Sequence, residues 1–322
     1  MPTRPPLARA LTRAATRALA AAAVVVAAPA ARAQYTFTTI EAPRTLDTFV
    51  FGANTAGQAV GFTEGEDGNY GFLYAGGTFT PLTAPGTFEA GGTRPYGIND
   101  LGQVAGESFG AEGPRGFLYS GGTFTPIHVP GALATSAYGI NNAGQIVGEY
   151  YEPDGTRGFL YTAGAFTPLE APGAGSTSAY GINGAGQVVG SYVDDTADRF
   201  RGFLYDGGTY TTFDAPGAVN TQARGINAAG QIVGFAEDGA GLFAFLLAGG
   251  EFTRFAVPGA LFTVALGIND AGQIAGVYAT ENGARGFIAT PTTIPEPGTL
   301  ALAAAGLVVV GGVVRVRRRA AR

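Results

Sequence analysis

The sequence predicts an all-β fold: a six-bladed β-propeller whose four-stranded blades are built from internal repeats of 42–45 residues. Three observations predict it: a motif that recurs six times, four strand-like segments in each repeat, and an extra strand-like segment before the first repeat. The motif is G-x-N-x-x-G-Q, and its asparagines are 45, 42, 42, 44 and 42 residues apart. They are Asn54, Asn99, Asn141, Asn183, Asn227 and Asn269.

Each repeat contains four short segments rich in β-branched and aromatic residues, separated by glycine turns, as is typical of β-strands. The first segment follows the motif, as in residues 186–190, and an acidic loop leads to the second, as in residues 158–161. Residues 165–169 typify the third, and a stretch rich in Thr and Ser leads to the fourth, as in residues 180–183. Four strands in about 43 residues match a propeller blade, whereas β-solenoid coils use fewer residues per turn.

The ends of the repeat array indicate how the ring closes. Residues 35–40 have the pattern of a third strand, like residues 77–82, although no first or second strand precedes them. The last repeat has its first and second strands, which end near residue 288, but no third strand follows. We therefore expect the N-terminal strand to complete the last blade by pairing with residues 286–289.

The N-terminal residues have the features of a secretory signal peptide. An apolar stretch at residues 18–31 follows four arginines, and Ala31-Arg32-Ala33 is an A-x-A cleavage pattern. The arginines are Arg4, Arg9, Arg13 and Arg17. We expect signal peptidase to remove residues 1–33 by cutting between Ala33 and Gln34, which leaves a propeller domain at residues 34–290.

The C-terminal residues consist of a short motif, an apolar run and a basic end. Pro295, Glu296 and Pro297 lie in a linker at residues 291–299, which precedes an apolar run at residues 300–314. As a helix this run spans roughly 22 Å, and snorkelling side chains extend it toward the hydrocarbon thickness of about 30 Å. We therefore expect a transmembrane helix whose basic tail, residues 315–322, stays cytoplasmic by the positive-inside rule. The arginines of the tail are Arg315, Arg317, Arg318, Arg319 and Arg322.

The order of these three parts resembles a PEP-CTERM sorting tail. The resemblance implies a substrate of exosortase, a membrane-embedded transpeptidase-like protease of Gram-negative bacteria, with cleavage near Pro297 after export. It also implies an inner-membrane intermediate and then a location at the cell surface or outside the cell. An ordinary single-span anchor is the alternative, but an anchor does not need Pro-Glu-Pro.

The repeats themselves resemble HAF-type extracellular repeats, in which G-x-N-x-x-G-Q and an aromatic F-L-Y segment recur. The chain departs from that family at the His-Ala-Phe triplet, where it has Arg-Gly-Phe at residues 115–117, 157–159 and 285–287. The resemblance implies an exported repeat protein of undefined activity.

Composition limits the partners of the domain. After removal of both ends the chain is residues 34–296, which carry all 24 acidic residues and nine of the 19 arginines, so their net charge is −15. Such an acidic domain is a poor partner for nucleic acid or anionic lipid. Because the chain has no cysteine, the exported domain has to be stabilised without disulfides.

The asparagine and glycine of the motif fit a hairpin connection. There the asparagine bonds its own backbone and the glycine takes a positive φ, as expected for Asn99 and Gly102. A second interpretation is an asparagine-lined channel or ligand ring, which requires all six asparagines to face one cavity. The glutamine that ends the motif, such as Gln103, is expected to form a polar ladder or to bond neighbouring backbone rather than to bind a sugar.

Acidic residues gather in the loops after the first strands, at residues 64–69, 152–155, 194–198 and 237–239. Calcium takes about six to eight oxygen ligands, and clustered carboxylates supply several of them. However, Asp-Gly and Asn-Gly are also the chemistry of tight turns, and none of these loops has the full EF-hand spacing. We therefore expect no cofactor, with the loop from Asp194 to Asp198 as the best candidate for calcium.

Catalytic signals are few. Residues 106–110 match G-x-S-x-G, but Ser108 is equivalent to Tyr150 and Tyr192 of sister repeats, and the repeat has no strand-turn-helix context for a nucleophile elbow. His128, the one histidine of the chain, is expected at a solvated strand end. One histidine and no cysteine exclude a zinc site of the usual composition. Carboxylate pairs remain available, and a glycosidase needs only two carboxylates.

Two functional hypotheses of different class follow. The first is a non-enzymatic cell-surface or matrix protein, a binding or structural module that accompanies exopolysaccharide. The second is a carbohydrate-active hydrolase or lyase on the same propeller. The first is favoured because an enzyme's blades should diverge where its site lies, and the repeats stay alike.

Overall fold

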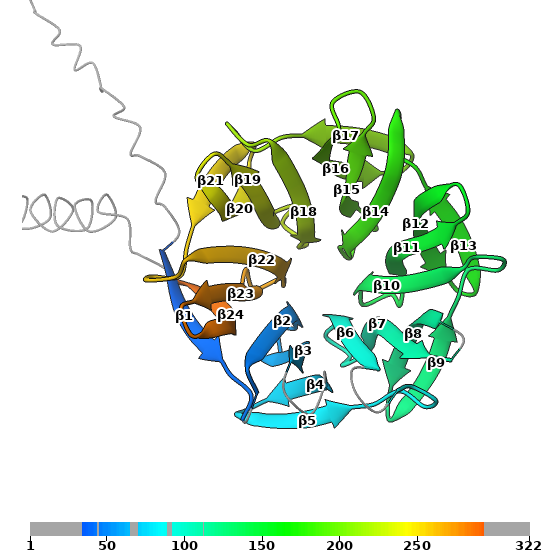
Figure 1. Cartoon of the computed structure of the whole chain (residues 1–322), viewed down its shortest axis with the longest axis horizontal. Coiled ribbons are helices and arrows are strands. Elements are labelled where there is room, and N and C mark those ends of the chain that lie inside the picture. Colours follow the sequence, from blue (N-terminus) through cyan, green and yellow to red (C-terminus); the bar gives the residue numbers. More distant parts are fainter. Residues whose placement is uncertain (1–33, 44, 65–69, 89–91, 112, 293–322) are drawn as a thin grey trace, which may run out of the picture. The chain divides into compact units, whose positions relative to one another are not determined.

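The described part of the chain is an all-β propeller of six blades (Figure 1), as the sequence predicts. The computed structural model describes residues 34–43, 45–64, 70–88, 92–111 and 113–292. These residues contain no helix long and apolar enough to cross a membrane. The predicted signal peptide, sorting motif and transmembrane helix lie outside the described residues.

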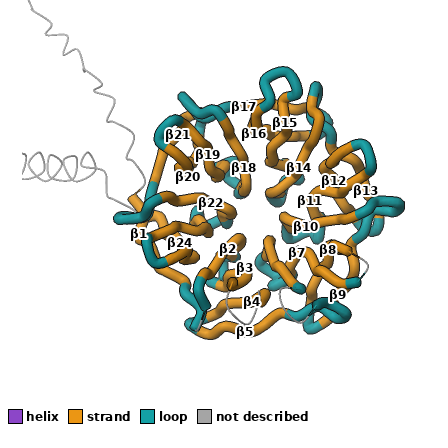
Figure 2. The backbone as a smooth tube through the Cα atoms, in the orientation of Figure 1, coloured by secondary structure: helices purple, strands orange, loops and turns teal. Residues whose placement is uncertain are grey.

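Each blade is an antiparallel sheet of four strands, and the strands are stacked outward from the central axis (Figure 2). Blade one contains β2 (Asp47–Ala53), β3 (Gln58–Glu64), β4 (Tyr70–Ala75) and β5 (Thr78–Leu82). Blade two contains β6 (Thr93–Ile98), β7 (Val104–Gly110), β8 (Gly113–Ser120) and β9 (Thr123–Ile127). Blade three contains β10 (Ala134–Ile140), β11 (Ile146–Glu152), β12 (Gly155–Thr162) and β13 (Ala165–Leu169).

The other three blades follow the same order. Blade four contains β14 (Ala174–Ile182), β15 (Val188–Asp194), β16 (Arg199–Asp206) and β17 (Thr209–Phe213). Blade five contains β18 (Asn220–Ile226), β19 (Ile232–Asp238), β20 (Gly241–Ala248) and β21 (Glu251–Phe255). Blade six contains β22 (Phe262–Ile268), β23 (Ile274–Thr280), β24 (Gly283–Thr292) and, as its outer strand, β1 (Gln34–Ile40).

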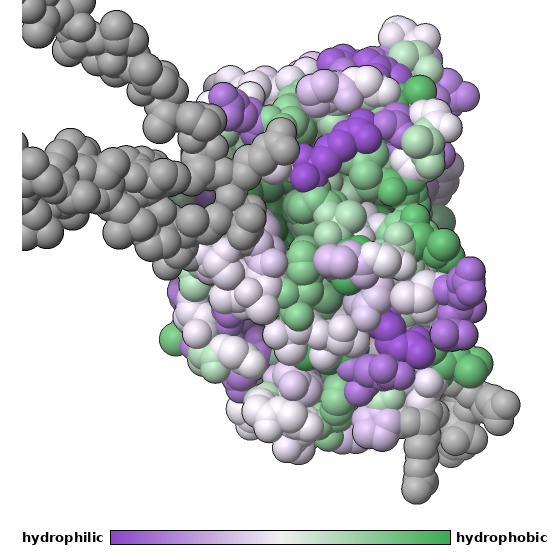
Figure 3. Space-filling model, turned by 90° about the vertical axis from the view of Figure 1, so that its left-hand side faces the viewer, coloured by the Kyte–Doolittle hydropathy of each residue, from purple (hydrophilic) through white to green (hydrophobic). Residues whose placement is uncertain are grey.

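The N-terminal strand closes the ring. β1 pairs antiparallel with β24, with Phe37 opposite Ala289 and Ile40 opposite Gly286, so the predicted closure is confirmed. The pairing continues to Thr292, two residues beyond the predicted end of the domain at residue 290, because β24 lengthens to match the start of β1. Figure 3 shows mixed hydrophilic and hydrophobic surface on the side of the domain where β1 lies.

The core lies within and between the blades, and each blade contributes one buried phenylalanine at the same position of the strand next to its outer strand, namely β4, β8, β12, β16, β20 or β24. They are Phe72, Phe117, Phe159, Phe203, Phe245 and Phe287, none more than 3% exposed. Each phenylalanine is paired with a glycine directly opposite, as Phe159 is with Gly148, which leaves room for the ring. Burying a side chain of this size contributes about 1.5–3 kcal/mol relative to leaving it exposed, so the repeated Phe-Gly pair is a main source of blade stability.

A buried threonine fixes the start of each inner strand. Thr135, Thr177, Thr221 and Thr263 each accept a hydrogen bond from the backbone N–H six residues earlier, at 3.0–3.1 Å. Thr48 and Thr93 make the equivalent bonds to Ala42 and Ala84. The bond ties the loop arriving from the previous blade to the inner strand, so successive inner strands reach the axis in the same register.

Candidate functional site at the mouth of the channel

The inner strands meet around a narrow axial channel, and each strand, together with the residue that follows it, contributes one residue to each of four layers. The first layer, which we call the mouth residues, comprises Phe51, Tyr96, Tyr138, Tyr180, Arg224 and Leu266. The second layer consists of Gly52, Gly97, Gly139, Gly181, Gly225 and Gly267. The third consists of Ala53, Ile98, Ile140, Ile182, Ile226 and Ile268. The six motif asparagines follow the inner strands and form the fourth layer.

The asparagine layer is a closed ring of hydrogen bonds. Each asparagine Nδ2 donates to the backbone carbonyl of the asparagine in the next blade at 3.0–3.2 Å, and Asn269 returns the bond to Asn54. The same Nδ2 donates to the Oε1 of the motif glutamine at 2.8–2.9 Å. The glutamines thus bond asparagine side chains, not the ladder or backbone partners expected from sequence.

Each asparagine also organises its own turn. Its Oδ1 accepts a hydrogen bond from the glutamine N–H four residues later at 2.9–3.0 Å. The glycine before that glutamine has φ between +73° and +82° in all six turns. With both ends of the amide in use and no more than 8% of any asparagine exposed, the ring joins the blades to one another.

The glycine layer lets the blades approach closely below the mouth. A Cβ on Gly139 would lie 2.7 Å from the Tyr180 carbonyl oxygen, and one on Gly181 would lie 2.8 Å from that of Arg224. Real Cβ atoms do not come this close to backbone, so each glycine is required by the neighbouring blade. The channel is therefore narrow here, with a cavity of about 80 Å³ that the mouth, glycine and aliphatic layers line together.

A β-bulge presents each mouth residue. In all six blades the pairing between the first two strands skips one residue, as between Ala137 and Gly139 in blade three. The skipped residue is the mouth residue, here Tyr138. Because a bulged residue leaves the ladder and its side chain is re-aimed, six bulges direct six side chains to one end of the channel.

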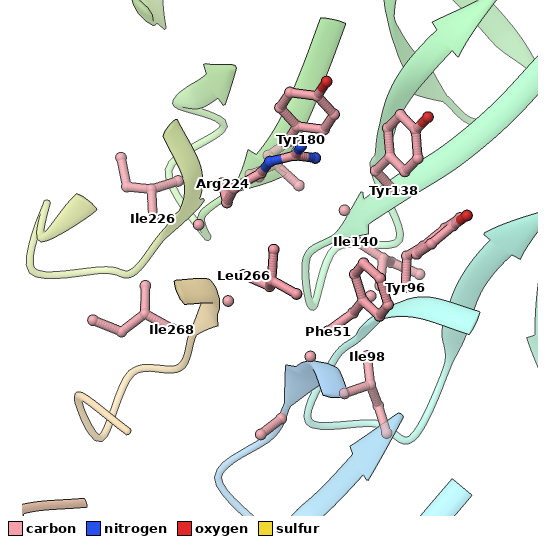
Figure 4. A pocket seen from close by; sticks show the side chains of 18 residues that line it. Phe51, Tyr96, Ile98, Tyr138, Ile140, Tyr180, Arg224, Ile226, Leu266 and Ile268 are labelled. Atoms are coloured by element: carbon pink, nitrogen blue, oxygen red, sulfur yellow. The ribbon is translucent and has the colours of Figure 1, made fainter. Parts of the chain in front are cut away.

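Four aromatic rings form an arc along the mouth (Figure 4). Phe51 and Tyr96 have ring centroids 4.9 Å apart, Tyr96 and Tyr138 5.1 Å, and Tyr138 and Tyr180 5.1 Å. The guanidinium of Arg224 lies 3.8 Å from the Tyr180 ring centroid and continues the arc. Leu266 and Phe62 complete a cavity of about 240 Å³.

Two buried glutamates hold the tyrosines from behind. The Tyr96 hydroxyl donates to Glu107 at 2.5 Å, and the Tyr138 hydroxyl donates to Glu149 at 2.8 Å. Each glutamate is only 6% exposed. Burial raises the pKa of Tyr96 and Tyr138, and the neighbouring carboxylates raise it further. Both phenols therefore remain hydrogen-bond donors at neutral pH.

The repeats diverge around this mouth, so the expectation that they stay alike, which favoured a non-enzymatic module over an enzyme, is wrong at these positions. We define the mouth shell as the mouth residue, the residue two before it, and the residue paired with the latter on the second strand of the blade. In blades one to six the shell reads Phe49, Phe51, Phe62; Arg94, Tyr96, Glu107; Ser136, Tyr138, Glu149; Ser178, Tyr180, Ser191; Gln222, Arg224, Phe235; and Val264, Leu266, Val277. Blades six and one are thus apolar, and blades two to five carry hydrogen-bonding groups.

Other candidate residues lie away from the mouth. The Oδ1 of Asp194 accepts bonds from the Thr196 hydroxyl and N–H, which lower the pKa of Asp194 below its ordinary value. Among the described residues no group of three or more His, Asp or Glu side chains is placed to hold a metal ion. Calcium binding by this loop stays a prediction, and residues 65–69 of the first acidic loop lie outside the description.

The two residues singled out as chance catalytic matches are also accounted for. The Ser108 hydroxyl donates to the Arg115 carbonyl at 3.2 Å. His128 is half-buried rather than solvated, which corrects the expectation, because its ring lies 2.7 Å from the Arg115 guanidinium and 3.1 Å from the Thr135 hydroxyl. Neither residue belongs to the mouth shell.

Sequence reasoning missed the mouth residues. It compared the repeats where they agree, and the mouth residue differs from repeat to repeat. One signal was present: the residue before Gly-Ile-Asn changes from Tyr to Arg to Leu while its neighbours stay fixed.

Comparison with known protein families identifies the C-terminal tail. Residues 293–319 match the family model of the PEP-CTERM protein-sorting motif. No curated protein matches the chain. Among solved structures, TolB from Acinetobacter baumannii is similar at 13% identity and a TM-score of 0.49, over 76% of this chain. The chain spans 63% of the length of that TolB.

Two further solved structures are similar at lower identity. Pyrococcus horikoshii acylaminoacyl peptidase has 10% identity and a TM-score of 0.44, over 80% of this chain and 54% of its own. Trypanosoma rangeli sialidase has 9% identity and a TM-score of 0.43, also over 80% of this chain and 54% of its own.

The fold and the tail together define an exported β-propeller. The chain carries a PEP-CTERM sorting tail, and such a tail marks an exosortase substrate that is secreted and processed at the membrane. The matched residues include Pro295, Glu296 and Pro297, the apolar run, and all the tail arginines except Arg322.

Proposed function

We propose that this protein is a non-enzymatic binding module, displayed at the cell surface or in the extracellular matrix, that associates with exopolysaccharide through the mouth of its channel. The observation that carries the proposal is the divergence of the repeats at the mouth shell. A purely structural propeller has no need to vary the six positions that its bulges present. Aromatic rings and buried hydrogen-bonding groups in one cavity are also the usual lining of a ligand site.

The asymmetry of the mouth supports a defined ligand. Arg224 and the tyrosines lie on one side, and Leu266 and Phe51 on the other, so a bound molecule has one preferred orientation. The asparagine ring and the glycine layer keep the inner strands in fixed positions. A rigid scaffold of this kind reduces the entropy lost on binding.

A glycan array with the full-length protein tests the binding function. We expect wild type to bind a subset of polysaccharides, and Tyr138→Ala to weaken that binding by about tenfold or more, the usual effect of truncating a central tyrosine. Asn142→Ala is the matched control, because Asn142 lies beyond the asparagine layer at the other end of the channel. Equal loss in both variants, or no binding by wild type, would contradict the proposal.

The route to the surface is tested separately by intact-mass measurement. We expect signal peptidase to release the chain at Gln34 and exosortase to cut near Pro297 in a host that has the enzyme. The variant Glu296→Ala should accumulate at the inner membrane with Arg322 still present. Wild-type protein outside the cell that retains Arg322 would count against processing by exosortase.

A carbohydrate-active hydrolase or lyase is the second candidate, and two observations favour it. The first is the same divergence of the repeats at the mouth shell, since the blades of an enzyme are expected to diverge where its site lies. The second is a pair of carboxylates. Glu107 and Glu149 are two buried carboxylates behind neighbouring mouth tyrosines, and glycosidases act through a carboxylate pair. Turnover of a bound polysaccharide by wild type that disappears in Glu107→Gln or Glu149→Gln would establish this candidate over the first.

A further inference from the structure

Unpaired buried polar atoms point to the chemistry of the ligand. In the described part of the chain three buried side-chain atoms lack a hydrogen-bond partner: Arg94 Nε, Ser191 Oγ and Arg224 Nε. All three belong to the mouth shell. Because a buried donor without a partner costs about 1–3 kcal/mol, their gathering around one cavity indicates a site built for more than stability.

Among the described residues, Arg224 is the one charged residue that lines the mouth cavity. One of its terminal nitrogens donates to Gln222 Oε1 at 2.8 Å, and its guanidinium stacks on Tyr180. None of the ion pairs among the described residues involves Arg224. A half-buried guanidinium without a carboxylate partner favours an anionic group in the ligand.

The volume of the cavity limits the ligand to one ring. Drug-sized ligands occupy pockets of about 300–1,000 Å³, and the mouth encloses about 240 Å³. The cavity that runs from the mouth residues through the glycine and aliphatic layers has a volume of only about 80 Å³. A polymer chain therefore does not thread the channel, and the mouth takes a terminal residue.

The walls of the cavity favour an amphipathic ring. Tyr138 and Tyr180 present ring surfaces against which the C–H face of a sugar can pack, in the way aromatic side chains bury apolar surface. Phe51 and Leu266 cover the opposite side without charge. The glutamates behind the tyrosines are already bonded to phenol hydroxyls, so Arg224 sets the charge preference of the cavity.

We propose that the mouth binds a uronic-acid residue at the end of a glycan, with its carboxylate on the Arg224 guanidinium and its ring against Tyr138 and Tyr180. This inference rests on the proposed function and names its substrate class. The net charge of −15 on residues 34–296 repels a long polyanion in general. That repulsion is screened beyond about 8 Å at physiological salt, so one terminal carboxylate in the mouth escapes most of it.

Titration calorimetry with four probes tests the assignment on the full-length protein. The probes are a trisaccharide ending in glucuronate, the same trisaccharide ending in glucose, free glucuronate, and a tripeptide with a free C-terminal carboxylate. We expect the glucuronate-terminated trisaccharide to bind at least about tenfold more tightly than its neutral counterpart, as a charge-assisted hydrogen bond provides. Similar affinity for free glucuronate would show that the terminal residue supplies the binding.

Arg224→Gln should remove the preference for glucuronate while thermal melting shows a folded domain. Arg254→Met is the matched control, since Arg254 also stacks on an aromatic ring, Phe243 at 3.4 Å, but lies on outer strand β21. We expect the control to bind as wild type does.

Three results would overturn the inference. Equal binding of the neutral trisaccharide, or unchanged glucuronate binding by Arg224→Gln, would refute the uronate assignment and leave a glycan-binding module in place. Tighter binding of the tripeptide would reassign the carboxylate to a protein partner. Absence of binding to any saccharide, here and on the glycan array, would refute the proposed function itself.

Discussion

At the residue scale, one position in each repeat can differ from blade to blade because the strand pairing does not depend on it. The bulge removes the mouth residue from strand pairing, so Tyr138, Arg224 and Leu266 can occupy equivalent places. The glycine and asparagine that follow cannot vary in this way. The glycine touches the backbone of the next blade, and the asparagine bonds both its own turn and its neighbour.

The mouth tyrosines should resist ionisation. Burial and the nearby carboxylates raise the pKa of Tyr96 and Tyr138, whereas a tyrosine in the unfolded chain ionises near pH 10. Because the unfolded state then loses protons that the folded state keeps, the free energy of unfolding is unaffected below about pH 10 and falls as pH rises above it. Ultraviolet titration of phenolate should show a late phase that coincides with unfolding.

The double variant Tyr96→Phe/Tyr138→Phe provides the comparison for that titration. It should show a smaller late phase and a weaker loss of stability at alkaline pH. If every tyrosine of the wild type ionised near pH 10 while circular dichroism still showed a folded domain, the result would contradict the buried hydrogen bonds from Tyr96 to Glu107 and from Tyr138 to Glu149.

At the element scale, the connection between the first two strands of each blade does two jobs. Inside the blade, the asparagine and a glycine with positive φ close a tight turn. Between blades, the asparagine amide reaches the next turn. The tight turn was predicted from the sequence because its residues are neighbours along the chain. The hydrogen bond between blades was not predicted, because the bonded asparagines lie 42–45 positions apart, and Asn269 and Asn54 lie 215 apart.

The turn glycines should differ in their tolerance of a side chain. Gly186 has φ +82°, and Gly184 in the same connection has open space around its Cβ position and no positive φ. We expect Gly186→Ala to lower the free energy of unfolding by about 1 kcal/mol, because an L-residue is strained there. Gly184→Ala should change it by under about 0.5 kcal/mol. Urea denaturation measures both, and equal effects would contradict the turn geometry.

The asparagine ring can be broken at one point with little change in shape. Asn141→Asp keeps the oxygen that organises the turn but replaces the donor that faces the Asn183 carbonyl and Gln145 Oε1. We expect a loss of about 1–3 kcal/mol, the cost of leaving buried acceptors unpaired. Thermal melting at neutral pH, with Asn282→Asp in an exposed turn as the control, checks this. If Asn141→Asp were as stable as that control, the asparagine ring would not contribute to the stability of the domain.

At the scale of the whole molecule, the ring closes because the N-terminal strand β1 completes the C-terminal blade. Blade six takes β22, β23 and β24 from the C-terminal side and β1 from the N-terminal side, so one sheet holds both ends of the propeller together. The ring of six asparagine hydrogen bonds also closes between these two blades, since Asn269 Nδ2 of blade six donates to the Asn54 carbonyl of blade one. The first and last blades are therefore connected at the rim of the propeller by β1 and at its axis by the asparagine hydrogen bond.

Closure by β1 can be locked chemically. Thr36 and Thr290 are directly opposite in the β1–β24 pair and both are exposed, and opposite residues of antiparallel strands lie within the Cα separation of a disulfide. The chain has no cysteine of its own. Oxidised Thr36→Cys/Thr290→Cys should therefore be more stable than its reduced form by about 2–4 kcal/mol. Failure of the pair to oxidise in folded protein would argue against closure by β1.

The sequence by itself determined the repeat, the four strands per blade, the closure by residues 35–40 and the sorting tail. These follow from local patterns, namely turn chemistry, strand composition and the order of motif, apolar run and arginines, which depend on neighbours along the chain. Only the tertiary structure decided that six bulged residues, one from each blade, share a cavity. Phe51 and Leu266 are far apart in sequence and meet because the ring closes. The residue type at this position also differs between blades, as Phe51, Tyr96 and Leu266 show, so no shared motif in the sequence indicated a common site.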